Sequence, residues 1–168
     1  MLTYLFSKLS KRLKVPTARA LFNGKDLKRK KRNKILIKSG VSIKGECSIT
    51  PPFFYEFGQI TIGNGVFINA GCVFLDNAPI TIGNDTLIGP NVTLTTASHE
   101  TSPELRGNGV IKAPIKIGQN VWLAAGVVVL PGVTIGNNSV IAANSVVRSD
   151  VPENTLYAGA PAVFKRNI

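Results

Sequence analysis

The chain contains a single histidine, His99, in the phrase TTASHETSPELR. An imidazole titrates close to neutral pH, so a histidine held beside a hydroxyl group can remove its proton and make it a nucleophile. A histidine in a polar segment is more often a solvated side chain, and its position alone leaves both interpretations open. Cys47 and Cys72 lie in apolar surroundings without metal-ligand spacing, so we expect packed thiols and no metal site.

A six-residue repeat occupies the sequence on both sides of this histidine and must position it. From Ile60 the chain reads ITIGNG, VFINAG, CVFLDN, ITIGND, TLIGPN and VTLTTA, and from Ile115 it reads IKIGQN, VWLAAG, VVVLPG, VTIGNN, SVIAAN and SVVRSD. The first and third residues of each unit are mostly Ile, Val or Leu, and the last three are turn formers. Because one unit cannot bury its apolar side alone, the units must stack, three to a triangular coil.

Two segments interrupt the repeat. Ala78 and Pro79 add two residues between coils, and residues 98–114, SHETSPELRGNGVIKAP, are too polar and Gly-rich to form a coil. A loop of this length inside a repeat usually carries function, so we expect an active-site loop there. Upstream, ILIKSG, VSIKGE and CSITPP at 35–52 are interpreted as one degenerate starting coil.

The phrases ITIG at 60–63 and 80–83 and VTIG at 133–136 resemble those of the hexapeptide-repeat transferases. The resemblance implies an all-β fold, a left-handed parallel β-helix with one inserted loop, which we assign to residues 35–166. The handedness follows from the resemblance alone. Residues 1–34 are assigned to a basic amphipathic N-terminal segment with a short helix.

A longer stretch is similar to the sugar O-acetyltransferases related to the galactoside, maltose and nodulation acetyltransferases. The similarity covers about residues 50–166, and its motifs include His99, ELR at 104–106, PIKIGQNVWL at 114–123 and AGAPA at 158–162. It implies transfer of an acetyl group from acetyl-CoA to a saccharide hydroxyl, with His99 as general base in a direct attack and with no metal. We consider an envelope or capsular polysaccharide precursor as the acceptor.

The same resemblance assigns residues to the acceptor. Asn69 matches an acceptor contact, and Tyr55 and Asn77 fall at two acceptor positions where the residue type differs from that of the family. Asp76, next to Asn77, is the carboxylate that can replace the second of these contacts.

On the donor side, the resemblance and the residue types assign seven positions to acetyl-CoA, namely Trp122, Ala125, Gly126, Ala143, Arg148, Ser149 and Arg166. Small residues let a ligand approach backbone N–H groups, so the corner formed by residues 124–126 is a candidate oxyanion hole. In the family such sites lie between the coils of a trimer, and we expect a homotrimer here.

The N-terminal segment holds the whole excess of charge. Residues 1–34 contain twelve Lys or Arg and one acidic residue, whereas residues 35–168 contain eight of each, which accounts for the net charge of +11. Helical spacing relates the apolar residues Leu2, Leu5, Phe6, Leu9 and Leu13 and predicts a basic amphipathic helix. It can lie on an anionic membrane, or pack on the protein while KRKKRNK at 28–34 is a solvated run. Nucleic-acid binding is the weaker interpretation, because no aromatic platform accompanies the charges.

Other functions and the location are constrained less directly. An amino-sugar N-acetyltransferase or an antibiotic acetyltransferase can share this solenoid, and so can a scaffold that has lost its chemistry. No apolar run approaches the roughly twenty residues that span a bilayer, and the first residues lack the pattern of a signal peptide. We therefore expect a cytoplasmic protein, peripheral at the inner face of the membrane if the basic segment binds lipid.

Overall fold

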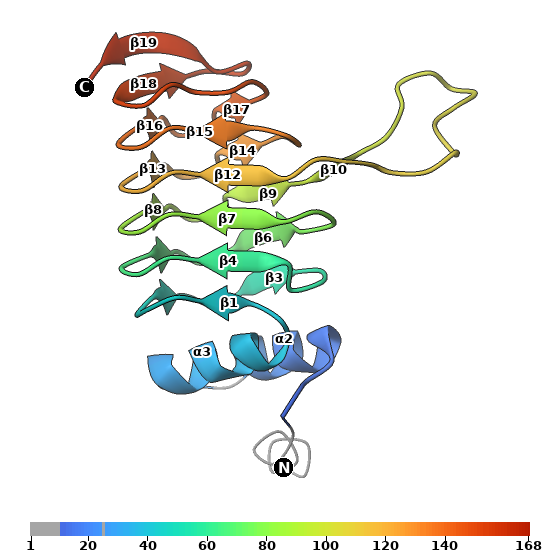
Figure 1. Ribbon diagram of the computed structural model, residues 1–168, viewed down its shortest axis with the longest axis vertical. Coiled ribbons are helices and arrows are strands. Elements are labelled where there is room, and N and C mark those ends of the chain that lie inside the picture. The colour runs from blue at the N-terminus through green and yellow to red at the C-terminus, as the bar shows by residue number, and fades with distance from the viewer. Residues whose placement is uncertain (1–10, 25) are drawn as a thin grey trace.

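The protein is a solenoid of short parallel strands, which the computed structural model describes for residues 11–24 and 26–168 (Figure 1). Three sheets form its sides. Sheet A contains β1 (Ser42–Ile43), β4 (Ile60–Ile62), β7 (Ile80–Ile82), β12 (Ile115–Ile117) and β15 (Thr134–Ile135). Sheet B contains β2 (Ser48–Ile49), β5 (Phe67–Ile68), β8 (Leu87–Ile88), β13 (Trp122–Leu123), β16 (Val140–Ile141), β18 (Thr155–Ala158) and β19 (Val163–Asn167). Sheet C contains β3 (Phe53–Tyr55), β6 (Cys72–Leu75), β9 (Thr93–Thr95), β14 (Val128–Val129) and β17 (Val146–Val147).

The coil is left-handed. In Figure 1 the front strands β4 and β7 run from right to left, the sheet C strands behind them run from left to right, and the chain rises from one coil to the next. The predicted parallel β-helix is therefore confirmed. Its hand agrees with the resemblance, which was the basis for predicting it.

Side-chain alternation within each short strand fills the interior with branched aliphatic residues. A column formed by Ile62, Ile82, Ile117 and Ile135 stands in register in sheet A, and all four side chains are buried. Burial of each such side chain contributes about 1.5–3 kcal/mol. The first and third positions of the hexads therefore form the core, as the repeat predicted.

From the second coil onward, the corner between sheets A and B has a left-handed backbone conformation. Asp85, Asn120, Asn138 and Asn154 adopt it, with φ values of 56°, 52°, 60° and 57°. Asn and Asp tolerate this conformation better than other side chains that carry a Cβ. The amides also join the coils, since Asn120 Nδ2 donates to Asn138 Oδ1 at 3.0 Å and Asn138 Nδ2 donates to Asn154 Oδ1 at 2.8 Å.

Two helices close the N-terminal end of the solenoid. They are α2 (Val15–Gly24) and α3 (Arg29–Lys38), and they lie across that end in Figure 1. The prediction that ILIKSG opens the first coil was wrong, because Ile35 and Leu36 are buried as one face of α3 and the first strand begins at Ser42. No helix among the described residues is long and apolar enough to cross a bilayer.

The described part of the basic segment packs on the solenoid. In α2, Phe22 is buried and its ring meets Phe53 edge to face, with 6.2 Å between centroids. The Leu13 N–H donates to the Lys38 carbonyl oxygen at 2.8 Å, and Leu13 packs against the core. Leu13 is the residue of the predicted apolar stripe that the structure describes, and it packs on the solenoid of its own chain, although residues 11–14 are not helical. The predicted helix at Leu2, Leu5, Phe6 and Leu9 lies outside the described residues.

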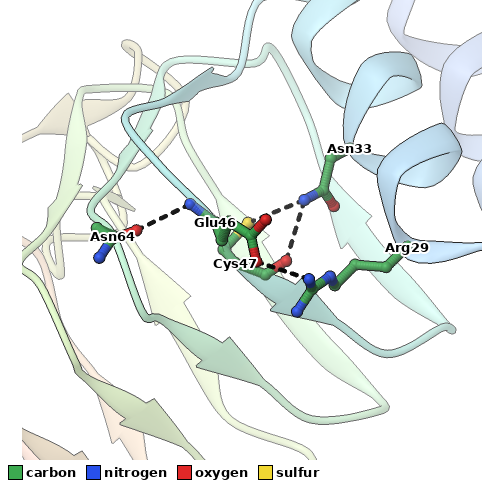
Figure 2. A network of polar contacts seen from close by, with 5 residues as sticks. All are labelled: Arg29, Asn33, Glu46, Cys47 and Asn64. Carbon is green, nitrogen blue, oxygen red and sulfur yellow. Dashed lines mark hydrogen bonds and ion pairs between the residues drawn. The ribbon is translucent and has the colours of Figure 1, made fainter.

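A polar network fastens α3 to the first two coils (Figure 2). Asn33 Nδ2 donates to the Cys47 carbonyl oxygen at 3.0 Å, and Arg29 pairs with Glu46 at 2.7 Å. Asn64 Oδ1, in the second coil, accepts the Glu46 N–H at 2.9 Å. The network thus links the helical cap to two successive coils.

Both cysteines are free and buried. Burial raises the pKa of Cys47 and the pKa of Cys72 to about 11. Both thiols are therefore protonated at neutral pH and act as small packed side chains, as their apolar surroundings predicted.

The C-terminal end is closed by β19, which turns back and pairs antiparallel with β18. The neighbouring pairs of sheet B, from β18 to β8, are parallel. Across the antiparallel pair, the rings of Tyr157 and Phe164 meet edge to face with 6.0 Å between centroids. The last strand therefore ends the succession of parallel coils.

Gly83 lies at a corner where the next coil leaves no room for a side chain. A Cβ at Gly83 would lie 2.5 Å from the Gly118 carbonyl carbon and 2.6 Å from the Gln119 nitrogen. We expect Gly83→Ala to lower the free energy of unfolding by about 3 kcal/mol, because backbone must move. A Cβ at Gly107 meets nothing within 4 Å, so Gly107→Ala should stay within about 0.5 kcal/mol of the unmodified protein in urea denaturation. Equal midpoints for the two variants would contradict the described coil packing.

Candidate active site

The inserted loop leaves the solenoid where sheet C turns into sheet A, at what we call the CA edge, and projects away from the coils (Figure 1). Its base is an antiparallel pair of β10 (Ala97–Ser98) and β11 (Ile111–Lys112). His99 directly follows β10, and its side chain is exposed. The excursion predicted at 98–114 is confirmed as a hairpin, and its base places the histidine beside the coils.

Short polar contacts fold the tip of this loop. The Ser102 hydroxyl donates to the Glu104 carboxylate, and Arg106 Nη2 donates to the Thr101 carbonyl oxygen at 3.0 Å. The hydrogen bond from Ser102 lowers the pKa of Glu104, so this exposed carboxylate is ionised at neutral pH. None of these contacts reaches the His99 ring, and no other side chain of the described residues hydrogen-bonds to it.

Asp76, predicted as an acceptor contact, is a buried structural carboxylate instead. One oxygen accepts the backbone N–H groups of Glu56 at 2.6 Å and Phe57 at 3.1 Å, and the other accepts that of Gln59 at 2.6 Å. The side chain has no exposed surface. A carboxylate satisfied in this way fixes the turn at 56–59 and offers nothing to a sugar.

Asn77 is the neighbouring residue that stays accessible at the CA edge. Its side-chain amide donates to the Glu56 carboxylate, and both residues are partly exposed. The Ala78 N–H donates to the Thr96 hydroxyl at 2.8 Å, which places this pair one coil below the base of the loop. Glu56 was not predicted as a site residue because it lies in the link PPFFYEFGQ at 51–59, outside the hexads. Together the pair offers the donors and acceptors that sugar hydroxyls need.

Tyr55 does not reach an acceptor from within this chain, contrary to the prediction. It is fully buried, its ring stacks on Phe53 with 5.6 Å between centroids, and its hydroxyl hydrogen-bonds to Ser39 Oγ at 2.6 Å. Alternation along β3 turns Phe54 outward instead, where the Arg19 guanidinium lies 4.2 Å from its ring centroid. Since successive strand residues face opposite sides, a shift of one residue exchanges a buried side chain for an exposed one.

The BC edge, where sheet B turns into sheet C, carries the small residues predicted for the donor. Asn69, Ala125 and Ala143 follow β5, β13 and β16, so they stack along this edge. The N–H groups of Ala124 and Gly126 donate at 2.9 Å to carbonyl oxygens of the coils above and below. The Ala125 N–H is therefore the donor of this corner that a ligand can use.

Trp122 stands on the outer face of sheet B, 52% exposed. It is in register with Leu87, and Leu87 is in register with Phe67, so three large apolar side chains form an exposed column. The hexad pattern predicted burial at the first and third positions only, so this column of second positions was not predicted. An exposed indole of this kind does not support a purely structural role for Trp122 within one chain.

The residues predicted for the phosphate groups are separated. Arg148 and Ser149 follow β17 at the CA edge, and both are exposed. Arg166 lies on β19, where it is exposed and Nη1 is 3.5 Å from the Asn167 carbonyl oxygen. All three side chains are therefore accessible to a ligand, from two different places on the chain.

Eight of the twelve predicted residues thus fall on the two edges of sheet C, whereas Trp122 lies on the face of sheet B, Arg166 lies on β19, and Tyr55 and Asp76 are buried. The CA edge carries His99, Asn77, Arg148 and Ser149, and the BC edge carries Asn69, Ala125, Gly126 and Ala143. Sheet C lies between them, so a single chain does not bring the histidine to the donor corner. The outer face of that sheet is apolar and partly exposed, with Phe54, Val73, Val128 and Val146 on it.

A hollow of about 480 Å³ lies on another side, over sheet A near the C-terminal end. Its lining includes Lys116, Thr134, Asp150 and Glu153. None of the predicted site residues contributes to it. The candidate site therefore consists of the CA and BC edges.

We expect Asp76→Asn to lower the free energy of unfolding by about 2–3 kcal/mol, because the new amide cannot accept all three backbone N–H groups. Asp85→Asn is the matched control, since Asp85 is exposed and Asn occupies the same corner in later coils. Chemical denaturation of both variants checks this. An Asp76→Asn protein of unchanged stability and impaired turnover would return Asp76 to the acceptor site.

Known proteins with related sequences include two galactoside O-acetyltransferases. Residues 114–149 match the bacterial transferase hexapeptide (six repeats) family. The chain is 45% identical to the Lactococcus lactis enzyme over 137 residues, 79% of this chain and 66% of that protein. It is 40% identical to the Escherichia coli enzyme over 161 residues, 94% of this chain and 79% of that protein. The chain thus spans slightly less than two thirds of the first relative and more of the second.

A solved structure is similar over most of the solenoid. The hexapeptide-repeat containing acetyltransferase of Vibrio cholerae, in complex with acetyl coenzyme A, superposes with a TM-score of 0.87 at 41% identity, over 91% of this chain and 84% of that chain. The identities of 40% and 41% extend over at least 79% of each relative. The similarity therefore includes the amino-acid sequence as well as the fold. The chain belongs to the hexapeptide-repeat acetyltransferases.

Proposed function

We propose that this protein transfers an acetyl group from acetyl-CoA to a hydroxyl group of a saccharide, with His99 as the general base. The supporting observation is the position of His99, exposed at the base of the projecting hairpin and one coil above the Asn77–Glu56 pair. Relatives in two bacteria are named galactoside O-acetyltransferases, and the Vibrio cholerae protein binds acetyl coenzyme A.

The reaction needs one proton relay. The imidazole of His99 takes the proton of the acceptor hydroxyl while its oxygen attacks the thioester carbonyl carbon. A C–O bond forms, the C–S bond breaks, and the proton passes from the imidazolium to the departing CoA thiolate. In this proposal the Ala125 N–H donates to the carbonyl oxygen as negative charge develops on it. No acetylated enzyme residue is required.

We assign groups from both edges to each substrate. On the acceptor side, the Asn77 amide and the Glu56 carboxylate bind sugar hydroxyls, and Asn69 contributes from the BC edge. This arrangement replaces the predicted contacts to Tyr55 and Asp76, which are buried.

On the donor side, the small side chains of Ala125, Gly126 and Ala143 leave room for the thin pantetheine arm along the BC edge. Arg148, Ser149 and Arg166 supply the cations and the hydroxyl for phosphate groups. Trp122, beside this edge, offers an apolar face to the same ligand.

We further propose that the active form is a homotrimer. Threefold packing about sheet C would place the CA edge of one copy against the BC edge of the next, and so bring His99 to Ala125. The same packing would cover the partly exposed apolar face formed by Phe54, Val73, Val128 and Val146. The two halves of the site occupy the two edges of that sheet, which supports this assembly.

We expect a saccharide acceptor in the cytoplasm, either a free sugar or a precursor of an envelope polysaccharide. The two free, protonated thiols fit a reducing compartment. An amino sugar is the alternative acceptor, and release of CoA thiol with a panel of hydroxyl and amino sugars distinguishes the two. No turnover with any acceptor would favour the non-catalytic scaffold.

We expect His99→Ala to lower kcat by roughly a hundredfold to ten-thousandfold, because the acceptor hydroxyl loses its base. The Kd for acetyl-CoA should stay within about twofold, since the imidazole contacts the acceptor. Glu100→Gln, at the exposed neighbouring position, is the control and should retain its turnover. Stopped-flow detection of CoA thiol measures kcat, and an unaffected His99→Ala enzyme would refute the mechanism.

A shared site predicts complementation between two inactive variants. His99→Ala removes the base, and Ala125→Trp fills the donor corner at an exposed position. Coexpression should restore turnover, because about one quarter of the randomly formed interfaces combine an intact CA edge with an intact BC edge. Light scattering on the same samples gives the mass. A fully active monomer, or no recovery in mixed trimers, would contradict the assembly.

A further inference from the structure

The N-terminal end of the solenoid is strongly basic. Its cations lie in the first turn of α3, where a helix favours negative charge. The first four residues of α3 are Arg29, Lys30, Lys31 and Arg32, and its first turn contains no acidic residue. Lys28 occupies the N-cap without a side-chain cap. Because the first turn of a helix carries partial positive charge, each of these cations destabilises α3. Residues that violate a local rule in this way usually serve another function.

Three lysines of α3 are exposed. They are Lys30, Lys31 and Lys34, and by helical spacing Lys30 and Lys34 lie on the side of the helix opposite its buried residues. The ion pairs recorded for this end among the described residues involve Arg29 and Arg32. None of the three lysines forms an ion pair among the described residues, and the acidic side chain that lines a hollow with Lys30 and Lys34 is Glu46, which pairs with Arg29.

An exposed isoleucine lies among these cations. Ile37 follows Lys30 and Lys34 at helical spacing, is 50% exposed, and lines a shallow hollow of about 240 Å³ with them. Ile37 also borders a second hollow, which Lys11 and Leu13 help to line. Cations around an apolar side chain suit an anionic bilayer, whose headgroups attract the charges and whose interface accepts the isoleucine.

The chain reaches this end from residues 1–10, MLTYLFSKLS, which are rich in apolar residues. Lys11 and Leu13, which follow this segment, lie against the end of α3 beside Ile37. An apolar segment together with a polybasic patch is a combination that holds proteins on membranes. Nucleic acid fits less well, because α3 carries no aromatic residue on which a base can stack.

We propose that the end of the solenoid formed by α2 and α3 binds a membrane surface rich in anionic phospholipids. The helices lie across this end, so the solenoid axis would stand away from the bilayer (Figure 1). With about 5 Å per coil and a helix layer about 10 Å thick, the base of the active-site loop lies roughly 20 Å from the headgroups. Where the proposed function also holds, the favoured acceptor is a membrane-attached saccharide. In a cyclic trimer all three basic ends face the same side, which multiplies weak contacts.

Flotation of the full chain with vesicles tests the proposal without any turnover. The vesicles contain phosphatidylcholine with about one third phosphatidylglycerol, and binding to pure phosphatidylcholine should be weak. K31E/K34E should lower binding at least about tenfold. K116E/K165E makes the same change in net charge at exposed positions far from α2 and α3 and should stay within about twofold. Ile37→Ser should weaken binding without changing its salt dependence.

Two properties keep this test interpretable. Acidic residues near a helix N-terminus are favourable, so K31E/K34E should match or exceed the parent chain in its denaturation midpoint. Acetyl transfer to a soluble sugar should be unchanged in both charge variants, so failure of membrane binding is distinguishable from failure of the enzyme. Equal losses for the two variants, equal binding to pure phosphatidylcholine, or preferential binding to duplex DNA or RNA would overturn the proposal.

Discussion

Every coil of this solenoid depends on a left-handed backbone conformation at its corners, under a neighbouring coil that stands only one strand spacing away. Gly71 and Asn91 occupy such positions one above the other, and a Cβ at Gly71 would lie 2.1 Å from Asn91 Oδ1. Gly126 and Asn144 repeat the arrangement, with 2.3 Å for the equivalent contact. These two corners therefore require a positive φ and a small residue beneath the amide, whereas at the corner between sheets A and B one Asn lies beneath another and hydrogen-bonds to it. This double requirement explains why Gly and Asn recur in the hexads.

The strands were predictable for the same reason, since few residue types meet both requirements and their period is visible in the letters. Outside the hexads that constraint disappears. Ile35 and Leu36 fit a strand or a helix equally well, and only their burial on α3 decides between them. Tyr55 lies in the irregular link at 53–59, and Asp76 accepts backbone hydrogen bonds from that link. In β3 of this link, adjacent residues alternate between the core and the surface, so an error of one position reverses the prediction. Which edges face each other depends on assembly, and no spacing within one chain reveals it.

The short strands also explain where chemistry can occur. Strands of two to five residues use their amides to pair with the coils above and below. The sides of the solenoid therefore have a uniform backbone, and the coils differ from one another mainly at the corners. At a corner, a residue such as Ala125 has an N–H that does not pair with an adjacent coil, or the chain can leave the solenoid as a loop. Sheet A is an example of a uniform side, since its outward residues Thr61, Thr81 and Thr134 form a regular polar surface.

The antiparallel strand β19 has a consequence for the number of coils. A stack of parallel strands ends in unpaired amides and carbonyls, which invite another stack to continue it into a fibre. Here β19 reverses direction over β18 and places Lys165 and Arg166 on the last strand, while α2 and α3 cover the opposite end. Neither end offers a matching partner for the other. Repeats that could pair with further repeats are thus covered at both ends of the described solenoid.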